Sequence, residues 1–119
     1  MNTVRSWISS IVVYLVLAGH VVVAEPLATV MKGQIVATTP EKLRVMIAEK
    51  DGSILDIAEP NRGGVFKLDL TIMDTPSLSE VMELDLQIRD KSGLRKKVPV
   101  AKYLNIFGDT VLLRPIQLK

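Results

Sequence analysis

Hydrophobic and polar positions alternate along two stretches of the chain. In residues 65–73 the apolar residues that share one face are Phe66, Leu68, Leu70 and Ile72. Residues 81–89 repeat this design with Met82, Leu84, Leu86 and Ile88. A period of two predicts a strand with one buried face and one wet face. We therefore expect both stretches to be strands of a half-buried sheet.

Shorter runs of the same kind bring the expected number of strands to seven. The others cover residues 29–36, 43–49, 54–58, 94–100 and 110–118. Turn signals separate them: Asp51-Gly52, residues 61–64 and residues 91–93. Residues 102–108 fit either a helical turn or a loop, and the pattern leaves both interpretations open.

Short strands at regular spacing, separated by Gly, Pro and Asn turns, predict an all-β fold. Each apolar face must be buried against a second sheet. The predicted architecture is a single antiparallel seven-stranded β-sandwich, prealbumin-like or Ig-like, that follows an N-terminal signal helix.

The first 24 residues have the layout of a secretory signal peptide. Arg5 precedes an apolar run over residues 7–17, and small residues Val22 and Ala24 precede a candidate cleavage point. We expect a signal peptide at residues 1–24 and a domain at residues 25–119. The alternative is an uncleaved membrane anchor, but the apolar segment is at the short end for a span. The expected location is secreted or periplasmic, with no membrane span after cleavage.

Composition narrows the classes of function. Removal of residues 1–24 takes away only Arg5 among the charged residues, so the formal charge falls from +2 to +1. Nearly balanced charge creates no long-range field that attracts nucleic acid, so we expect no nucleic-acid partner. The chain has no cysteine, which in an exported protein favours a bacterial periplasm or surface over a small disulfide-rich scaffold.

Three segments resemble a known family when they are taken together. They are "MKGQIV", "LRVMIAEKDGSILDI" and "NRGGVFKLDL". This series is similar to the carboxypeptidase regulatory-like or transthyretin-like (prealbumin-like) β-sandwich domain. The matching positions are Gly33, Ile35, Val45, Ile47, Asp51, Gly52, Asn61, Gly64, Phe66 and Leu68. The resemblance covers residues 31–73 and implies a non-catalytic, extracytoplasmic sandwich that binds or spaces other molecules.

The residue types present exclude the common catalytic sites from the domain. The only histidine, His20, lies in the predicted signal peptide, and there is no cysteine. Ser-His-Asp and Cys-His catalysis and the usual zinc and copper sites therefore lack their residues. We expect no enzymatic activity, no cofactor and no metal.

The carboxylates are expected to be structural. Asp69, Glu83 and Asp85 alternate with apolar neighbours and should be solvated. An up-and-down strand order would place four loop acids at one end without the spacing of a calcium loop: Asp51, Asp74, Glu80 and Asp109.

A basic stretch over residues 89–102 carries the candidate partner contacts, which are Lys91, Arg95, Lys96 and Lys97. The same strand order would place Lys42 and Arg62 at the end that carries Lys91. The stretch suits an acidic partner, a phospholipid surface or lipopolysaccharide. The alternative, which we favour, is that its lysines protect an edge strand, since Pro99 also marks an edge.

The expected function is therefore that of a small exported β-sandwich that contacts a protein partner in the cell envelope, with addition of a partner strand at a sheet edge as one contact mode. The alternative is a module that binds a glycan or an anionic lipid through its basic end.

Overall fold

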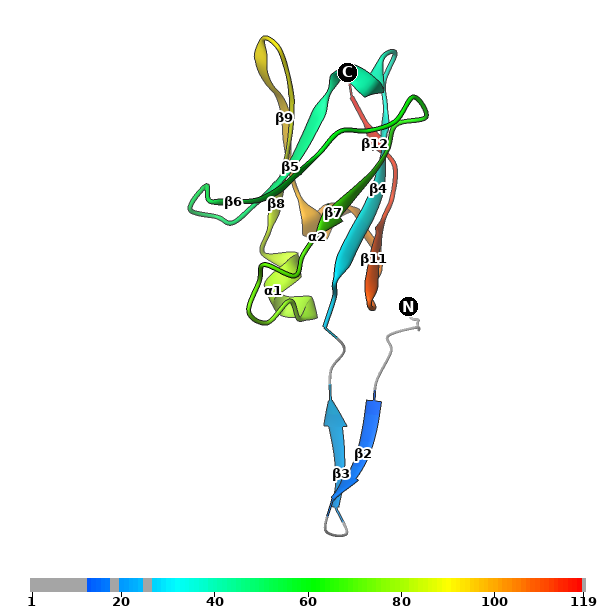
Figure 1. Cartoon of the computed structure of the whole chain (residues 1–119), viewed down its shortest axis with the longest axis vertical. Coiled ribbons are helices and arrows are strands. Elements are labelled where there is room, and N and C mark those ends of the chain that lie inside the picture. The colour runs from blue at the N-terminus through cyan, green and yellow to red at the C-terminus, as the bar shows by residue number, and fades with distance from the viewer. Residues whose placement is uncertain (1–12, 18–19, 25–26, 119) are drawn as a thin grey trace.

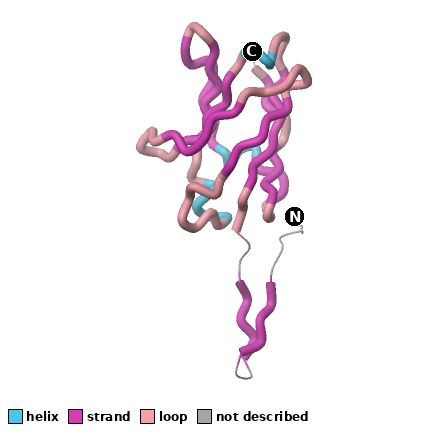
Figure 2. Tube along the Cα trace, in the orientation of Figure 1, coloured by secondary structure: helices cyan, strands magenta, loops and turns pink. Residues whose placement is uncertain are grey.

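A computed structural model describes residues 13–17, 20–24 and 27–118 of the chain, and these residues are mostly in β-strands (Figures 1 and 2). Two larger sheets, one of four strands and one of five, contain the strands between residues 30 and 117. The prediction of an all-β fold is confirmed at this level.

The four-stranded sheet is antiparallel throughout, in the order β6, β5, β8, β9. Its members are β5 (Arg44–Ala48), β6 (Ile54–Ala58), β8 (Asp85–Asp90) and β9 (Gly93–Pro99). The strands expected at residues 43–49, 54–58 and 94–100 agree with β5, β6 and β9 to within one residue at each end. The tight turn at Gly52 forms as expected, with a positive φ of 95°.

The five-stranded sheet is mixed, so the prediction of a wholly antiparallel sandwich is wrong. Around β4 (Val30–Val36) lie one antiparallel neighbour, β7 (Val65–Asp69), and two parallel ones, β11 (Thr110–Leu113) and β12 (Ile116–Gln117). The register pairs Thr110 with Val30 and Leu112 with Lys32, so β11 runs in the same direction as β4. The start of β11 thus lies beside the start of β4.

The number of strands in the two sheets also exceeds the expected seven, for two reasons. Residues 110–118 form two strands, because Pro115 interrupts the run between β11 and β12. The ambiguous stretch contains the end of α2 (Val100–Tyr103) and then β10 (Leu104–Ile106), which is antiparallel to β11.

One hydrophobic core lies between the two sheets, an arrangement consistent with a β-sandwich. The four-stranded sheet contributes Val45, Ile47, Leu86, Ile88 and Val98, and the five-stranded sheet contributes Met31, Ile35, Phe66, Leu68, Val111, Leu113 and Ile116. Figure 1 shows the strands of the two sheets on opposite sides of the sandwich.

Two glycines let β4 and β7 approach closely at this core. A Cβ on Gly33 would lie 2.5 Å from the ring carbon Cζ of Phe66, so the aromatic ring occupies the space above the glycine. Gly64 has a positive φ of 85°, and a Cβ there would collide with the carbonyl oxygen of Ile35. Both glycines are therefore required by close packing.

The strand predicted at residues 65–73 is shorter than expected. It ends at Asp69, because the carboxylate Oδ1 of Asp69 accepts hydrogen bonds from the backbone N–H of Thr71 at 2.8 Å and from its hydroxyl at 2.7 Å. The chain turns there, so Phe66, Leu68 and Leu70 are buried as expected, whereas Ile72 is 65 % exposed.

The strand predicted at residues 81–89 is replaced in its first part by helix α1 (Leu78–Met82). The side chain of Ser77 accepts a hydrogen bond from the N–H of Glu80 at 3.4 Å and caps the helix. The pair Ser77 and Glu80 has the spacing of a capping box, a signal that outweighs the alternation which follows it. Met82, expected in the core, is 39 % exposed.

The predicted signal helix at residues 1–24 is not confirmed. Much of the segment lies outside the described residues, and its described parts are two strands, β2 (Val13–Leu17) and β3 (His20–Ala24), which pair with each other in antiparallel fashion. The predicted cleavage point after Ala24 borders undescribed residues and stays a prediction. Within the described part of the chain, no helix is both long and apolar enough to span a membrane.

Candidate functional site

The four predicted contact residues lie on and beside β9, which is an edge strand of the four-stranded sheet. The expectation that this basic run forms an edge is confirmed. Lys91 lies in the turn between β8 and β9, and Arg95, Lys96 and Lys97 lie on β9 itself. Pro99 is the last residue of the strand.

Three of these residues are bound by groups of the protein itself. Arg95 Nη1 lies 2.6 Å from Asp90 Oδ2, and Lys96 Nζ donates to the backbone oxygen of Gln117 at 2.8 Å. Lys97 Nζ lies 4.0 Å from Asp85 Oδ2. Their side chains therefore point to different parts of the molecule and do not form one basic patch.

A different set of basic residues does converge, in a cleft at one end of the four-stranded sheet. We call it the cationic cleft, defined by Lys42, Arg44, Arg89 and Lys91. Lys42 ends the short 3-10 helix η1 (Pro40–Lys42), Arg44 begins β5, and Arg89 lies opposite Arg44 on β8. Lys42 and Lys91 thus share one end of the domain as predicted, whereas Arg62 does not line the cleft.

Two apolar residues and three acids also line the cationic cleft. Leu43 and Met46 line it together with Glu41, Glu59 and Asp90, and its volume is about 420 Å³. Arg44 Nε lies 4.0 Å from Glu59 Oε2, and both side chains are exposed, so this ion pair is weak. The guanidinium of Arg89 donates to the side-chain oxygen of Gln87, at 3.2 and 3.1 Å.

Among the described residues, three of the four cations of the cleft have no ion-pair partner within 4.0 Å: Lys42, Arg89 and Lys91. Asp90 faces Arg95 instead, and the hydrogen bond from Arg95, followed by that from the N–H of Ser92, lowers the pKa of the Asp90 carboxyl below its ordinary value. The lining of the cleft therefore has a small excess of positive charge, and most of its cations are not held in close ion pairs.

Carboxylates elsewhere in the described part of the chain accept hydrogen bonds within turns and do not converge on a shared site. The backbone N–H of Ser53 lowers the pKa of Asp51, and the hydroxyl of Thr71 lowers the pKa of Asp69. In the described part of the chain, no group of three His, Cys, Asp or Glu residues is placed to hold a metal ion. The loop acids Asp51, Asp74, Glu80 and Asp109 accordingly form no such group.

The expectation that Asp85 is solvated is wrong. Its exposure is 6 %, and it is the one buried charged side chain among residues 27–118. Lys50 Nζ, from the turn after β5, lies 2.9 Å from Asp85 Oδ1. Asp69 and Glu83 are exposed as predicted. The ion pair ties the β5–β6 turn to the start of β8.

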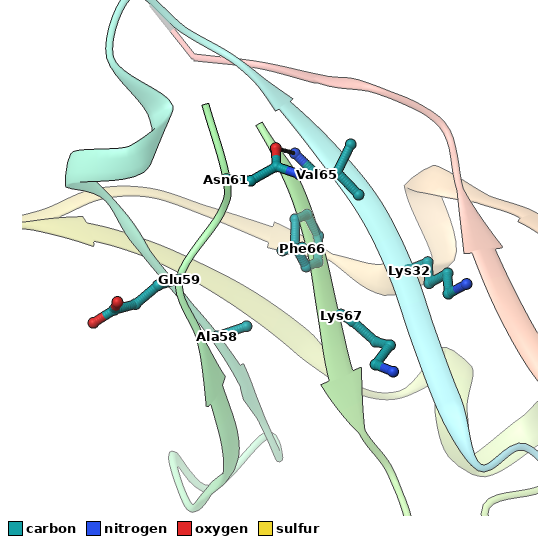
Figure 3. Close-up of a pocket in the computed structure, with 7 residues that line it drawn as sticks. All are labelled: Lys32, Ala58, Glu59, Asn61, Val65, Phe66 and Lys67. Carbon is teal, nitrogen blue, oxygen red and sulfur yellow. Dashed lines mark hydrogen bonds between the residues drawn. The ribbon is translucent and has the colours of Figure 1, made fainter. Parts of the chain in front are cut away.

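A second groove, of about 470 Å³, lies between β6 and β7 (Figure 3). Its lining consists of Lys32, Ala58, Glu59, Asn61, Val65, Phe66 and Lys67. Asn61 Oδ1 accepts from the N–H of Val65 at 3.0 Å, and the N–H of Asn61 donates to the oxygen of Val65 at 3.0 Å. Farther along β7, Asp56 Oδ2 accepts from the N–H of Asp69 at 2.7 Å.

The sequence missed both clefts because each depends on strand pairing. The opposition of Arg44 and Arg89, which are 45 positions apart, follows from the β5–β8 register and has no local signal. The same holds for Lys32 and Lys67 on β4 and β7. Comparison with known proteins found no family model, no curated protein and no solved structure that matches the chain.

Proposed function

We propose that this protein is a small, exported, non-catalytic β-sandwich module that contacts an acidic segment of a partner protein in the periplasm or at the cell surface. The resemblance to carboxypeptidase regulatory-like and transthyretin-like domains belongs to this proposal. It is supported by the structural use of its motif positions: Gly52 and Gly64 adopt positive φ angles, and Gly33 packs under Phe66.

The cationic cleft is the observation that carries the proposal. Its lining combines four basic residues with Leu43 and Met46, and no described carboxylate lies within 4.0 Å of Lys42 or Lys91. An acidic segment with apolar side chains complements both properties, because charge complementarity steers association and apolar contact supplies affinity.

The mixed signs at the rim favour a protein over the alternative partners. Glu41 and Glu59 line the cleft beside the cations. An anionic lipid surface or a polyanionic glycan would bring negative charge against these acids, whereas a protein segment can place a cation there. A binding module for glycan or anionic lipid therefore remains the second candidate.

Two of the sheet edges, β7 and β9, are poorly suited to addition of a partner strand, which favours contact through the cleft. Along β7, both backbone groups of Val65 are bound by Asn61, and the N–H of Asp69 is bound by Asp56. Along β9, Pro99 lacks an N–H, and the lysines hinder the approach of another strand. These edges offer few free groups to a partner.

The test compares a cleft variant with a matched control. In Arg44→Gln/Arg89→Gln the cleft loses two charges, and in Arg62→Gln/Lys102→Gln the same charge is lost from exposed sites outside it. In the full chain, a photo-crosslinking residue at position 41, which lines the cleft but is not one of its cations, should give a crosslinked product of defined mass in envelope extract. We expect the cleft variant to lose this product and the control to keep it. Equal crosslinking by both variants would refute the proposal.

The same variants distinguish the second candidate. Binding of the full chain to phosphatidylglycerol vesicles and to a sulfated polysaccharide is measured by sedimentation and by anisotropy. The protein-contact proposal predicts weak binding to both that does not depend on the cleft. Strong binding that the cleft variant loses would instead establish the glycan- or lipid-binding function.

A further inference from the structure

Lys32 and Lys67 form a like-charge pair on the outer face of the five-stranded sheet. They are direct partners in the register of β4 and β7. The hydrogen bonds from Leu70 N to Thr29 O, at 2.9 Å, and from Ile35 N to Gly64 O, at 2.8 Å, fix which pairs exchange backbone bonds. Hydrogen-bonded and non-hydrogen-bonded pairs alternate along the β4–β7 ladder, and Lys32 and Lys67 form a non-hydrogen-bonded pair. In such pairs the two residues lie closest, with Cα atoms about 4.5 Å apart.

The fold gives this pair no compensation. Within residues 27–118, neither lysine has a carboxylate within 4.0 Å. Glu59 lines the same groove, but Figure 3 shows its carboxylate directed away from both lysines, which extend in a common direction from their two strands. Like charges directly opposite each other destabilise a sheet. The pair therefore works against folding.

Protection of a sheet edge explains only half of the pair. β7 is an edge strand, and a lysine there discourages association through the edge. Lys32 lies on β4, which has β7 on one side and β11 and β12 on the other. A lysine on an interior strand protects no edge, so Lys32 needs another explanation.

The register continues this pair into an apolar surface. Leu112 on β11 is the partner of Lys32, and Ile106 on β10 is the partner of Leu112. Their exposures are 37 % and 44 %. We call Lys67, Lys32, Leu112 and Ile106 the lysine row. Because neighbouring strands lie about 4.8 Å apart, the row extends about 14 Å across the outer face.

We propose that the lysine row is a second contact surface, which binds a segment of a partner protein that carries carboxylates next to apolar side chains. The carboxylates bind between Lys32 and Lys67, and the apolar side chains cover Leu112 and Ile106. The row lies on the sheet opposite to the cationic cleft and shares no residue with it. The module therefore has two separate surfaces, and one copy can join two acidic segments.

The shape and charge of the row favour a polypeptide as the occupant. A small amphiphile is normally held in a concave pocket, but Leu112 and Ile106 lie outside the groove that contains the two lysines. Binding to an anionic membrane typically uses four to eight basic residues, whereas the row has two and Asp69 lies two positions from Lys67 on the same strand face.

The test uses the full chain and a capped synthetic peptide that contains two glutamates followed by two leucines. Binding is followed by shifts of backbone amide NMR signals, and a peptide with glutamine in place of glutamate is the ligand control. We expect shifts at Lys32, Lys67 and Leu112. Lys32→Gln/Lys67→Gln should weaken binding at these positions by about tenfold, since two exposed charge contacts are lost together. Arg62→Gln/Lys102→Gln should leave it unchanged.

Two further variants separate the components of the proposal. Arg44→Gln/Arg89→Gln should leave shifts at the lysine row intact even if it abolishes binding at the cationic cleft, so failure at one surface is distinct from failure at the other. Ile106→Ser/Leu112→Ser should weaken peptide binding severalfold. Full binding by this variant would mean that the lysines bind any anion, which would overturn the proposal for a mixed segment.

Stability supplies a control for folding. Because Lys32 and Lys67 repel each other, the glutamine variant should unfold at a urea concentration at least as high as the wild type, so that its loss of binding is not a loss of structure. Unchanged peptide binding by the variant would overturn the proposal. So would binding of phosphatidylglycerol vesicles in preference to the peptide, or a dimer of the full chain that Lys32→Gln/Lys67→Gln dissociates.

Discussion

At the scale of single residues, two glycines and one aspartate show which features can be predicted from the local sequence and which cannot. The turn from Asn61 to Gly64 was predicted from its composition, and Gly64 does adopt a positive φ. The close approach of Gly64 to the Ile35 carbonyl, and of Gly33 to Phe66, has no local signal, because each pair joins two strands. The burial of Asp85 likewise has no local signal, because its ion-pair partner Lys50 comes from a turn that is distant in the sequence.

Gly64 and Gly52 allow a matched test of this difference. Both have positive φ, but a Cβ would collide with Ile35 at Gly64 and meets no atom within 4 Å at Gly52. Gly52→Ala should cost about 1–2 kcal/mol for the left-handed backbone. Gly64→Ala should cost about 1–3 kcal/mol more from overcrowding. Urea unfolding measures both, and equal losses would show that the β4–β7 approach does not constrain Gly64.

At the scale of elements, periodicity predicted most strands and failed where capping intervened. The bounds of β6 were predicted without error, and those of β5 and β9 to within one residue. The alternating run at residues 81–89 begins inside helix α1 rather than in a strand. This helix forms because the side chain of Ser77 caps it by accepting a hydrogen bond from the N–H of Glu80. A capping box at the start of an alternating run should therefore take precedence over the alternation.

The side chain of Asp56 protects the edge of β7. Its carboxylate binds the N–H of Asp69, a group that points away from β4. In Asp56→Ala this N–H becomes available to another chain, and we expect concentration-dependent association that exceeds that of the wild type. Sedimentation equilibrium over a range of concentrations measures the effect.

Asp56→Asn is the control for this variant, because an amide keeps an oxygen acceptor at the same position. It should associate no more than the wild type. If Asp56→Ala behaves in the same way as Asp56→Asn, the edge of β7 is protected by something other than this hydrogen bond.

At the scale of the whole molecule, three exposed turn carboxylates make stability depend on pH. Hydrogen bonds lower the pKa values of Asp51, Asp69 and Asp90 from the ordinary value of 3.8. Because the pKa values are lower in the folded than in the unfolded state, the stabilisation is fully present above the unfolded-state value and is lost as the pH falls from there through the lowered values. The urea midpoint should therefore change little between about pH 7 and pH 5 and fall below about pH 4.

Replacement of these three aspartates by asparagine tests the cause. Asparagine keeps an acceptor oxygen for the turn hydrogen bonds but does not titrate in this range. The triple variant should show a flatter acid limb than the wild type. Parallel acid limbs for the two proteins would assign the loss of stability to other groups.

What the sequence by itself determined is the all-β class of the fold and most of its strands. Period-two alternation, the Asp51-Gly52 turn, the turn over residues 61–64 and interrupting prolines act over a few residues, so they can be recognised without knowledge of the neighbouring strands. The tertiary structure alone decided which strands lie side by side. That choice makes β11 and β12 parallel to β4, brings Arg44 to Arg89 and Lys32 to Lys67, and disperses the basic run of β9. The physical reason is that register depends on burying one common core, so the surfaces available to a partner are set by residues far apart in the chain.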